Sequence, residues 1–166
     1  MGVKKNELVQ WIGGLEALKD DIPEIMSQIA VGEGQYAVRQ ARQICTDDPS
    51  EPKHQKTGVV NTGEYRRNWK SDKTAKRSGK RYTVRFFNGL DYASHLEYGF
   101  RSHYVPGDHL SGPLRSKFPD GFYIGTPGGY VRGHFTMKRA VKRTLKNQDA
   151  RVKRKFWQEA NKRMKK

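Results

Sequence analysis

The apolar residues of the N-terminal part recur at helical spacing in two successive blocks. The first block predicts a short amphipathic helix over residues 5–19, which Gly13 and Gly14 weaken. The second predicts one long helix from residue 21 to about residue 45, because Asp20–Glu24 places acidic residues around Pro23, as the first turn of a helix often does. The apolar positions are Leu8, Trp11, Ile12, Leu15 and Leu18, then Ile25, Met26, Ile29, Ala37, Ala41, Ile44 and Cys45.

The middle of the chain predicts an antiparallel hairpin. Residues 46–60 contain two prolines and mixed charges without a period, which indicates a loop. Tyr65 and Trp69 then lie one helical turn apart, and for Trp69 packing in the core is the favoured role. Strand-like residues 70–75, a turn at 77–80 and the alternating run 82–87 form the hairpin. Its tip is basic, with Lys76, Arg77, Lys80 and Arg81.

A short helix over residues 92–98, stopped by Gly99, follows the hairpin. Residues 100–133 are rich in Gly and Pro and carry scattered aromatic residues. We expect one short strand near Phe122–Ile124 there, within a long excursion that reaches a neighbouring subunit.

The last part of the chain has a single apolar stripe, interrupted only at Asp149. It predicts a continuous helix over residues 136–164 of roughly 40 Å, longer than the domain is wide, so that its far end overhangs. The stripe consists of Met137, Val141, Leu145, Val152, Phe156, Ala160 and Met164.

Together these elements predict an α+β fold, in which a small antiparallel sheet packs with a long N-terminal helix and a long basic C-terminal helix. The length of 166 residues fits a single domain over residues 1–166. Its parts are the N-terminal helix within 1–20, an α+β core over 21–137 with loops at 46–60 and 100–133, and a basic helical arm over 138–166.

Charge is concentrated in that arm. The chain has 33 Lys+Arg against 17 Asp+Glu, a net charge of +16, and residues 136–166 contain 13 of the bases with only 2 acids. An excess confined to one arm favours contact with an anionic partner, either an acidic protein surface or nucleic acid. The residues expected to make this contact are Arg151, Lys153, Arg154 and Lys155.

No pattern of catalytic or cofactor-binding residues stands out. Cys45, the single cysteine, excludes an intrachain disulfide and is interpreted as a buried thiol, and no histidine has a second ligand at metal-binding spacing. Gly125–Gly129 lacks the Lys-Ser/Thr of a phosphate loop and is read as a turn, and Glu97 as a hydrogen-bonded structural acid. We expect no enzyme, no cofactor, no metal and no membrane span, in a soluble chain of a reducing compartment.

Two motifs in succession carry a resemblance to a known family. Asn61–Trp69 reads NTGEYRRNW and Asp91–Phe100 reads DYASHLEYGF, and Val131–Met137, VRGHFTM, follows at the entry to the last helix. In this order, over about residues 57–137, the sequence resembles the neck or tail-completion proteins that join head to tail in long-tailed bacteriophages. The resemblance implies an α+β domain, a ring-forming oligomer that is usually hexameric, no catalysis, and a place at the top of the tail. Tyr65, Asn68 and Leu96 stand where the family usually has Leu, Ser and Val, and Thr136 is an additional residue.

The resulting hypothesis is a structural virion protein that forms a ring at the head–tail junction. We expect it in the host cytoplasm during assembly and in the neck of the virion afterwards. Its partners would be head-completion or connector proteins, tail-terminator or tail-tube proteins, and genomic DNA in the lumen. Predicted interface residues are Arg66, Arg67, Glu97, Tyr98, Tyr123 and Phe135. The alternatives are a stand-alone basic nucleic-acid-binding protein and, third, a small basic nuclease.

Overall fold

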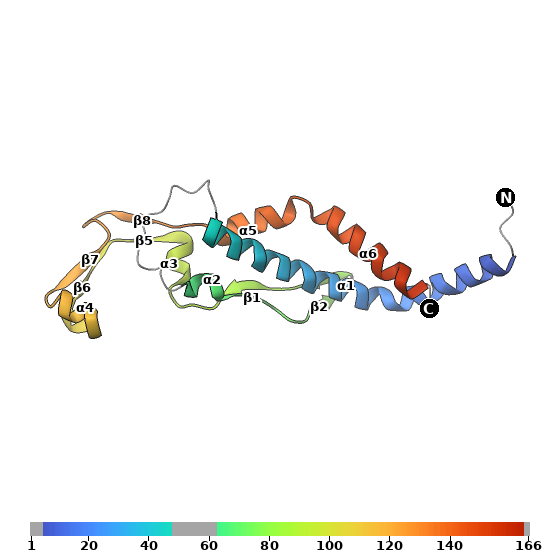
Figure 1. The fold of residues 1–166 in the computed structure, drawn as a ribbon, viewed down its shortest axis with the longest axis horizontal. Coiled ribbons are helices and arrows are strands. Elements are labelled where there is room, and N and C mark those ends of the chain that lie inside the picture. The colour runs from blue at the N-terminus through green and yellow to red at the C-terminus, as the bar shows by residue number, and fades with distance from the viewer. Residues whose placement is uncertain (1–4, 48–62, 165–166) are drawn as a thin grey trace. The chain divides into compact units, whose positions relative to one another are not determined.

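The computed structural model describes residues 5–47 and 63–164 (Figure 1). It divides into two compact units: residues 1–89 together with 137–166, and residues 90–136. The single domain therefore remains a prediction, and most of the predicted loop at 46–60 lies outside the described residues.

The first unit is built on one continuous helix, α1 (Lys5–Asp47). The prediction of two helices that meet near residue 20 was wrong, because α1 runs through Pro23. A proline inside a helix removes a backbone hydrogen bond and costs about 3 kcal/mol. Packing offsets this cost, since Leu18 and Ile25 on either side of the proline are both buried in one cluster with Ala160.

Two long helices near the end of the described chain, α5 (Thr136–Leu145) and α6 (Gln148–Met164), also belong to the first unit from Met137 onward. The prediction of one continuous C-terminal helix was therefore wrong, because the chain leaves the helix at Lys146 and Asn147. Helix α6 runs antiparallel to α1: Arg151 lies against Glu33, whereas Met164, at the other end of α6, lies against Gly14. The C-terminal helix does not overhang, because it is packed on α1 along its length (Figure 1).

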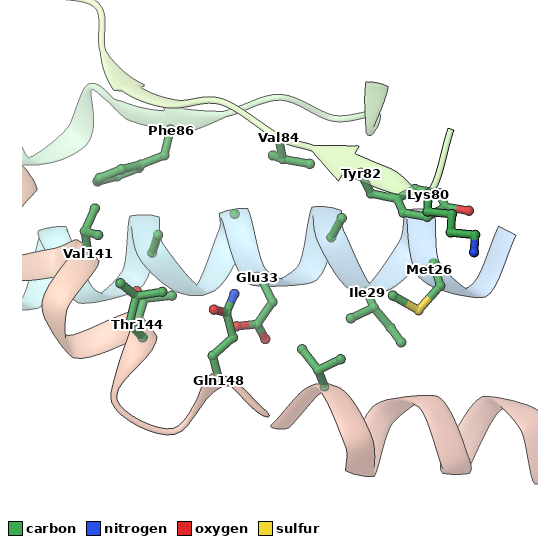
Figure 2. Close-up of a pocket in the computed structure, with 15 residues that line it drawn as sticks. Met26, Ile29, Glu33, Lys80, Tyr82, Val84, Phe86, Val141, Thr144 and Gln148 are labelled. Atoms are coloured by element: carbon green, nitrogen blue, oxygen red, sulfur yellow. The ribbon is translucent and has the colours of Figure 1, made fainter. Parts of the chain in front are cut away.

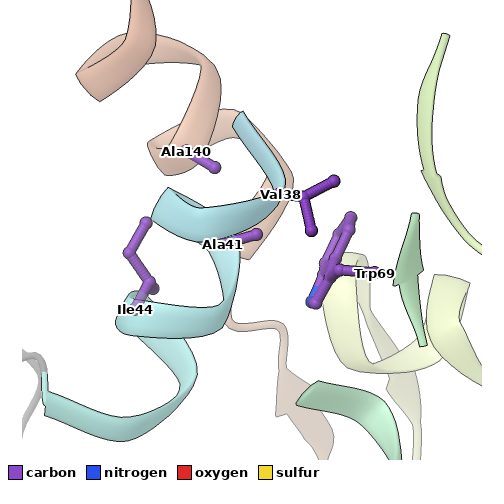
Figure 3. Packing of buried hydrophobic residues seen from close by; sticks show 5 residues of the cluster. All are labelled: Val38, Ala41, Ile44, Trp69 and Ala140. Carbon is purple, nitrogen blue, oxygen red and sulfur yellow. The ribbon is translucent and has the colours of Figure 1, made fainter. Parts of the chain in front are cut away.

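Two apolar clusters hold these helices together. The first joins α1 to α6 through Leu18, Ile25, Ile29 and Ala160, with Met26, Val152, Phe156 and Met164 around them. The second joins α1 to α5 and to the hairpin through Val38, Ala41, Ile44, Trp69 and Ala140 (Figure 3). Trp69 is 1% exposed, as its predicted role in the core requires.

The hairpin follows a short helix, α2 (Glu64–Arg67). Strand β1 (Trp69–Ser71) pairs antiparallel with β4 (Phe86–Asn88), and β2 (Lys76–Ser78) with β3 (Arg81–Thr83). This confirms the predicted hairpin, with the tip at Gly79, where φ is 59°. Between the two ladders, Arg85 donates two side-chain hydrogen bonds to the Asp72 carboxylate.

Gly34 allows the hairpin to lie directly on α1. A Cβ at this position would come within 2.6 Å of Cγ1 of Val84 and 3.2 Å of Cβ of Ser71. Such distances are shorter than van der Waals contact, so only glycine permits this approach. Gly32 differs, since the nearest atom to its added Cβ is the flexible Nζ of Lys155, at 3.1 Å.

The second unit contains the predicted short helix, α3 (Ala93–Tyr98), which Gly99 ends at a φ of 87°. It holds more regular structure than the one strand expected between residues 100 and 133. Strand β5 (Gly99–Arg101) pairs antiparallel with β8 (Tyr130–Arg132), and β6 (His103–Pro106) with β7 (Gly121–Ile124). A 3-10 turn, η1 (Gly107–His109), and α4 (Gly112–Lys117) connect β6 to β7. The expected strand near Phe122 is β7.

The fold class is therefore mixed α and β, with long helices at both ends of the chain and small antiparallel sheets between them, as predicted. No helix among the described residues combines the length and the apolar character needed to cross a membrane.

Candidate partner-binding surfaces

The four basic residues predicted to contact an anionic partner lie on two sides of α6. Arg151 and Lys155, one turn apart, both bind the Glu33 carboxylate of α1, at 2.6 Å and 3.3 Å. Lys153 and Arg154 are exposed. Of the four residues, this second pair presents its charge outward, and the contact with an anionic partner stays a prediction.

Glu33 is the centre of a buried ionic cluster. Arg151 donates to both carboxylate oxygens, lies over the ring of Tyr36 at 4.1 Å, and also donates to the carbonyl oxygen of Thr144 at 2.6 Å. Burial acts to raise the pKa of Glu33, but the hydrogen bonds from Arg151 and Lys155 outweigh it, and the pKa lies below its ordinary value. The carboxylate is thus ionised and neutralised by two cations from α6.

The C-terminal end of α6 is attached to α1 by a second ionic contact. Arg163 lies 2.8 Å from a carboxylate oxygen of Asp21 and 3.4 Å from one of Glu24. The hydrogen bonds from these acids raise the pKa of Arg163. Part of the positive charge of the arm therefore holds the chain together and is not available to a partner.

Helix α5 has an exposed face of mixed character. Val141 is 40% exposed and Leu145 58%, which is high for large apolar side chains. Lys142 on the helix and Lys146 directly after its end are also exposed, each next to one of them in the sequence. This face combines apolar area with positive charge.

A groove opens between α1, the hairpin and the α5–α6 pair, all within the first unit (Figure 2). Its volume is about 390 Å³. Figure 2 shows Tyr82, Val84 and Phe86 entering from the hairpin, Met26 and Ile29 from α1, and Val141 and Thr144 from α5. The groove is a candidate binding surface of mostly apolar lining.

The second unit carries exposed tyrosines. Tyr104 and Tyr123 face each other across β6 and β7 with ring centroids 5.3 Å apart, and they are 46% and 50% exposed. Tyr98 and Tyr130 are 61% and 62% exposed, and the Tyr130 hydroxyl donates to the carbonyl oxygen of Tyr98. Tyrosines offer large amphipathic area at protein interfaces.

The other predicted interface residues lie in different settings. Arg66 and Arg67 are exposed on α2, whereas Phe135 is half-buried. Glu97 is buried, and its carbonyl oxygen accepts a hydrogen bond from the backbone N–H of Phe135. The structure thus brings Tyr98, Glu97 and Phe135 together at the end of α3 and leaves Arg66 and Arg67 on a separate element.

Glu33 and the exposed pair Val141 and Leu145 were missed by the sequence reasoning. A signal existed for Glu33, because Ile25, Ile29, Ala37 and Ala41 define an apolar stripe with steps of four, and position 33 falls on it. A carboxylate on such a stripe needs a cationic partner. Nothing in the sequence distinguishes the exposed Val141 and Leu145 from the other members of the C-terminal stripe.

Within the described residues no group of three or more His, Cys, Asp or Glu side chains is placed to hold a metal ion. Cys45 is half-buried beside the second apolar cluster.

One comparison with known proteins gives a match. A family model described as "Bacteriophage HK97-gp10, putative tail-component" matches residues 10–99, which is more than half of the chain. The match extends from α1 through the hairpin to the end of α3, and it includes the two motifs around Trp69 and Tyr98. The comparisons with curated proteins and with solved structures give no match. The chain belongs to the HK97-gp10-like family of bacteriophage tail components.

Proposed function

We propose that this tail-component protein forms an oligomeric ring, a hexamer by the resemblance noted above, at the junction of head and tail. In this position it joins the tail to the head, between head-completion or connector proteins and tail-terminator or tail-tube proteins. The protein acts by binding to other virion proteins and catalyses no reaction. Family membership is the single observation that carries this proposal.

Two surfaces support the assembly. The tyrosines of the second unit, with Tyr123 and Tyr98 as the most direct candidates, provide an interface for a neighbouring subunit. Because subunits of a ring meet through two different patches, the tyrosine surface would contact a different surface of the next copy. Lys153 and Arg154 provide an outward positive charge for an acidic neighbour or for DNA in the lumen.

The test uses particles that lack this protein. Heads and tails from a phage in which the gene is deleted are mixed with the purified full chain, and joined particles are counted by negative-stain electron microscopy. We expect unjoined heads and tails without the protein, joined particles after its addition, and a ring at the top of isolated tails. Particles that mature and stay joined in its absence would contradict the proposal.

A second function is favoured by one feature of α6. Trp157 is 58% exposed, and the exposed Lys153 and Arg154 precede it by about one turn. Aromatic rings that stack on bases, next to cations that neutralise phosphates, are typical of proteins that bind nucleic acid. A stand-alone nucleic-acid-binding protein would stay monomeric, and with about six phosphate contacts its log–log salt dependence would have a slope near about −5. A ring that binds DNA weakly at physiological salt would exclude this alternative.

A further inference from the structure

The groove of the first unit runs along one face of α1. Its floor follows α1 from Met26 to Ala37, a distance of roughly 16 Å, or about three helical turns. The hairpin forms one wall and the α5–α6 pair the other (Figure 2). A partner helix of three to four turns would match this length.

The lining of the groove favours a partner helix with an apolar face. Met26, Ile29, Val84, Phe86 and Val152 contribute apolar side chains to the groove. At its mouth Val141 and Leu145 are 40% and 58% exposed. Large apolar side chains left exposed beside a hollow mark interaction sites in soluble proteins.

The charge around the groove favours a partner helix that has acidic residues beside its apolar face. Glu33 is the only acid among the described residues that line the groove, and Arg151 and Lys155 neutralise it. A second hollow on α5 shares Val141 and Leu145 with the groove and is otherwise lined by basic residues, among them the exposed Lys142 and Lys146. Lys80 adds a positive charge on the hairpin side. The apolar mouth thus lies between positive charges.

We propose that this groove binds an acidic amphipathic helix of a neighbouring virion protein. Apolar residues at every third or fourth position would enter the groove, and carboxylates beside them would contact Lys142 and Lys146. A second copy of this chain fits less well, because each copy carries a net charge of +16. The identity of the partner as a virion protein rests on the proposed function, whereas the binding of an acidic helix can be measured without a ring.

The probe is a synthetic fluorescein-labelled peptide of about four turns, with Leu at helical spacing and Glu at the remaining positions. Its binding to the full chain is followed by fluorescence anisotropy. Two matched peptides replace every Glu by Lys, or every Leu by Ser. We expect the Leu/Glu peptide to bind and both matched peptides to bind at least about tenfold more weakly, since each lacks one of the two complementary features.

Two variants of the protein locate the site. Leu145→Glu places a carboxylate at the mouth of the groove, and it should weaken binding of the Leu/Glu peptide by about tenfold or more. Leu114→Glu is the matched control, because Leu114 is 51% exposed on α4 in the other unit. This control should bind as the unchanged protein does. Thermal unfolding of both variants checks that each is folded, and the double variant Lys142→Glu with Lys146→Glu repeats the test through charge alone.

Three results would overturn the proposal. In the first, the Leu/Glu peptide does not bind at about 1 mM. In the second, the Leu/Glu and Ser/Glu peptides bind equally well. In the third, the Leu145→Glu and Leu114→Glu proteins lose the same amount of binding. The protein is also tested with a short DNA duplex. If Leu145→Glu weakens DNA binding more than peptide binding, the surface belongs to nucleic acid instead.

The particle-joining assay is run in parallel on the unchanged protein. Joining without peptide binding would remove the groove proposal alone, and peptide binding without joining would remove the proposed function alone.

Discussion

The guanidinium of Arg151 lies 2.6 Å from a carboxylate oxygen of Glu33, and the same nitrogen donates to the carbonyl oxygen of Thr144. One side chain of α6 is thereby bound to the middle of α1 and to the last turn of α5. The carbonyl groups at the end of a helix lack partners within the helix, and Arg151 supplies one. This contact fixes α6 at the point where it departs from α5.

Replacing Arg151 should therefore destabilise the first unit. Arg151→Met leaves the buried Glu33 with Lys155 alone and removes the hydrogen bond to Thr144, and we expect a loss of about 3 kcal/mol in the free energy of unfolding. Lys155→Met is the matched control, because the Lys155 side chain is 33% exposed and Arg151 remains; its cost should be below about 1 kcal/mol. Urea unfolding of both proteins measures the difference. Equal costs would contradict the central role of Arg151.

Glu33 predicts a dependence of stability on pH. Its pKa in the folded chain lies below its ordinary value of 4.5, so the unfolded chain binds the proton more readily. The stabilisation is then present above the unfolded pKa and is lost as the pH falls through the folded pKa. Glu33→Gln should be less stable than the unchanged protein at pH near neutral, and the gap should narrow as the solution is acidified below the unfolded value. Thermal unfolding of both proteins across this range is the measurement, and a gap that is constant with pH would exclude ionisation of Glu33 as the cause.

Two neighbouring glycines of α1 provide a test of the packing between helix and hairpin. Gly→Ala inside a helix is stabilising by up to about 1 kcal/mol in the absence of a clash. Gly34→Ala should nevertheless destabilise, because the new methyl group would lie 2.6 Å from Cγ1 of the stiff Val84. Gly32→Ala should be neutral or stabilising, since the Lys155 ammonium can move away. Gly34→Ala should lower the free energy of unfolding and Gly32→Ala should not, and an equal loss in both variants would contradict the close approach at Gly34.

Two of the three tryptophans, Trp69 and Trp157, provide a second matched pair. Trp69→Ala removes a side chain that is 1% exposed and stacked on Phe86 at 4.9 Å, and its cost should be about 3–5 kcal/mol. Trp157→Ala, at a side chain that is 58% exposed, should change the free energy of unfolding by less than about 0.5 kcal/mol. Chemical unfolding followed by far-UV circular dichroism is suitable for both, because it does not depend on tryptophan fluorescence. A large cost at Trp157 would indicate that its exposed face is needed for folding.

Periodicity predicted the type of most elements but not where helices begin and end. Asp20–Glu24 has the composition of a helix start, yet α1 continues through it, because Leu18 and Ile25 on both sides pack against α6. Conversely, Leu145 and Val152 keep the same helical phase, so the sequence predicts one helix where the chain breaks at Asn147. In the first case, contacts between residues more than a hundred positions apart decide the outcome, and local patterns do not contain them. At the break, Arg151 binds both Glu33 of α1 and the carbonyl oxygen of Thr144, and periodicity does not reveal these contacts either.

The strands of the second unit were mostly missed for a different reason. Strands β5 and β8 have three residues each, which is too short for an alternation to be recognised. Their pairing depends on Gly99, where a Cβ would lie 2.3 Å from the carbonyl oxygen of Val131. The sequence indicated the end of a helix at this glycine but not the strand that it faces. For the candidate site, the sequence showed the basic arm, but it did not show which of the basic residues bind Glu33 and which are exposed.

The exposed tyrosine pair of the second unit predicts a defect in assembly without a defect in folding. Tyr123→Ala removes a half-exposed ring whose main contact is Tyr104 across the strands, so its cost in stability should be below about 1 kcal/mol. If the tyrosine surface contacts the next subunit, the same change should strongly reduce both ring formation on tails and the number of joined particles, because buried tyrosines are frequent hot spots of interfaces. Phe87→Ala on the hairpin is the matched control, at a ring that is 38% exposed, and should assemble normally. If the Tyr123→Ala protein joins particles normally, the contact between subunits lies elsewhere on the chain. If both variants lose the same fraction of joined particles, the cause is a general effect of removing exposed aromatic area.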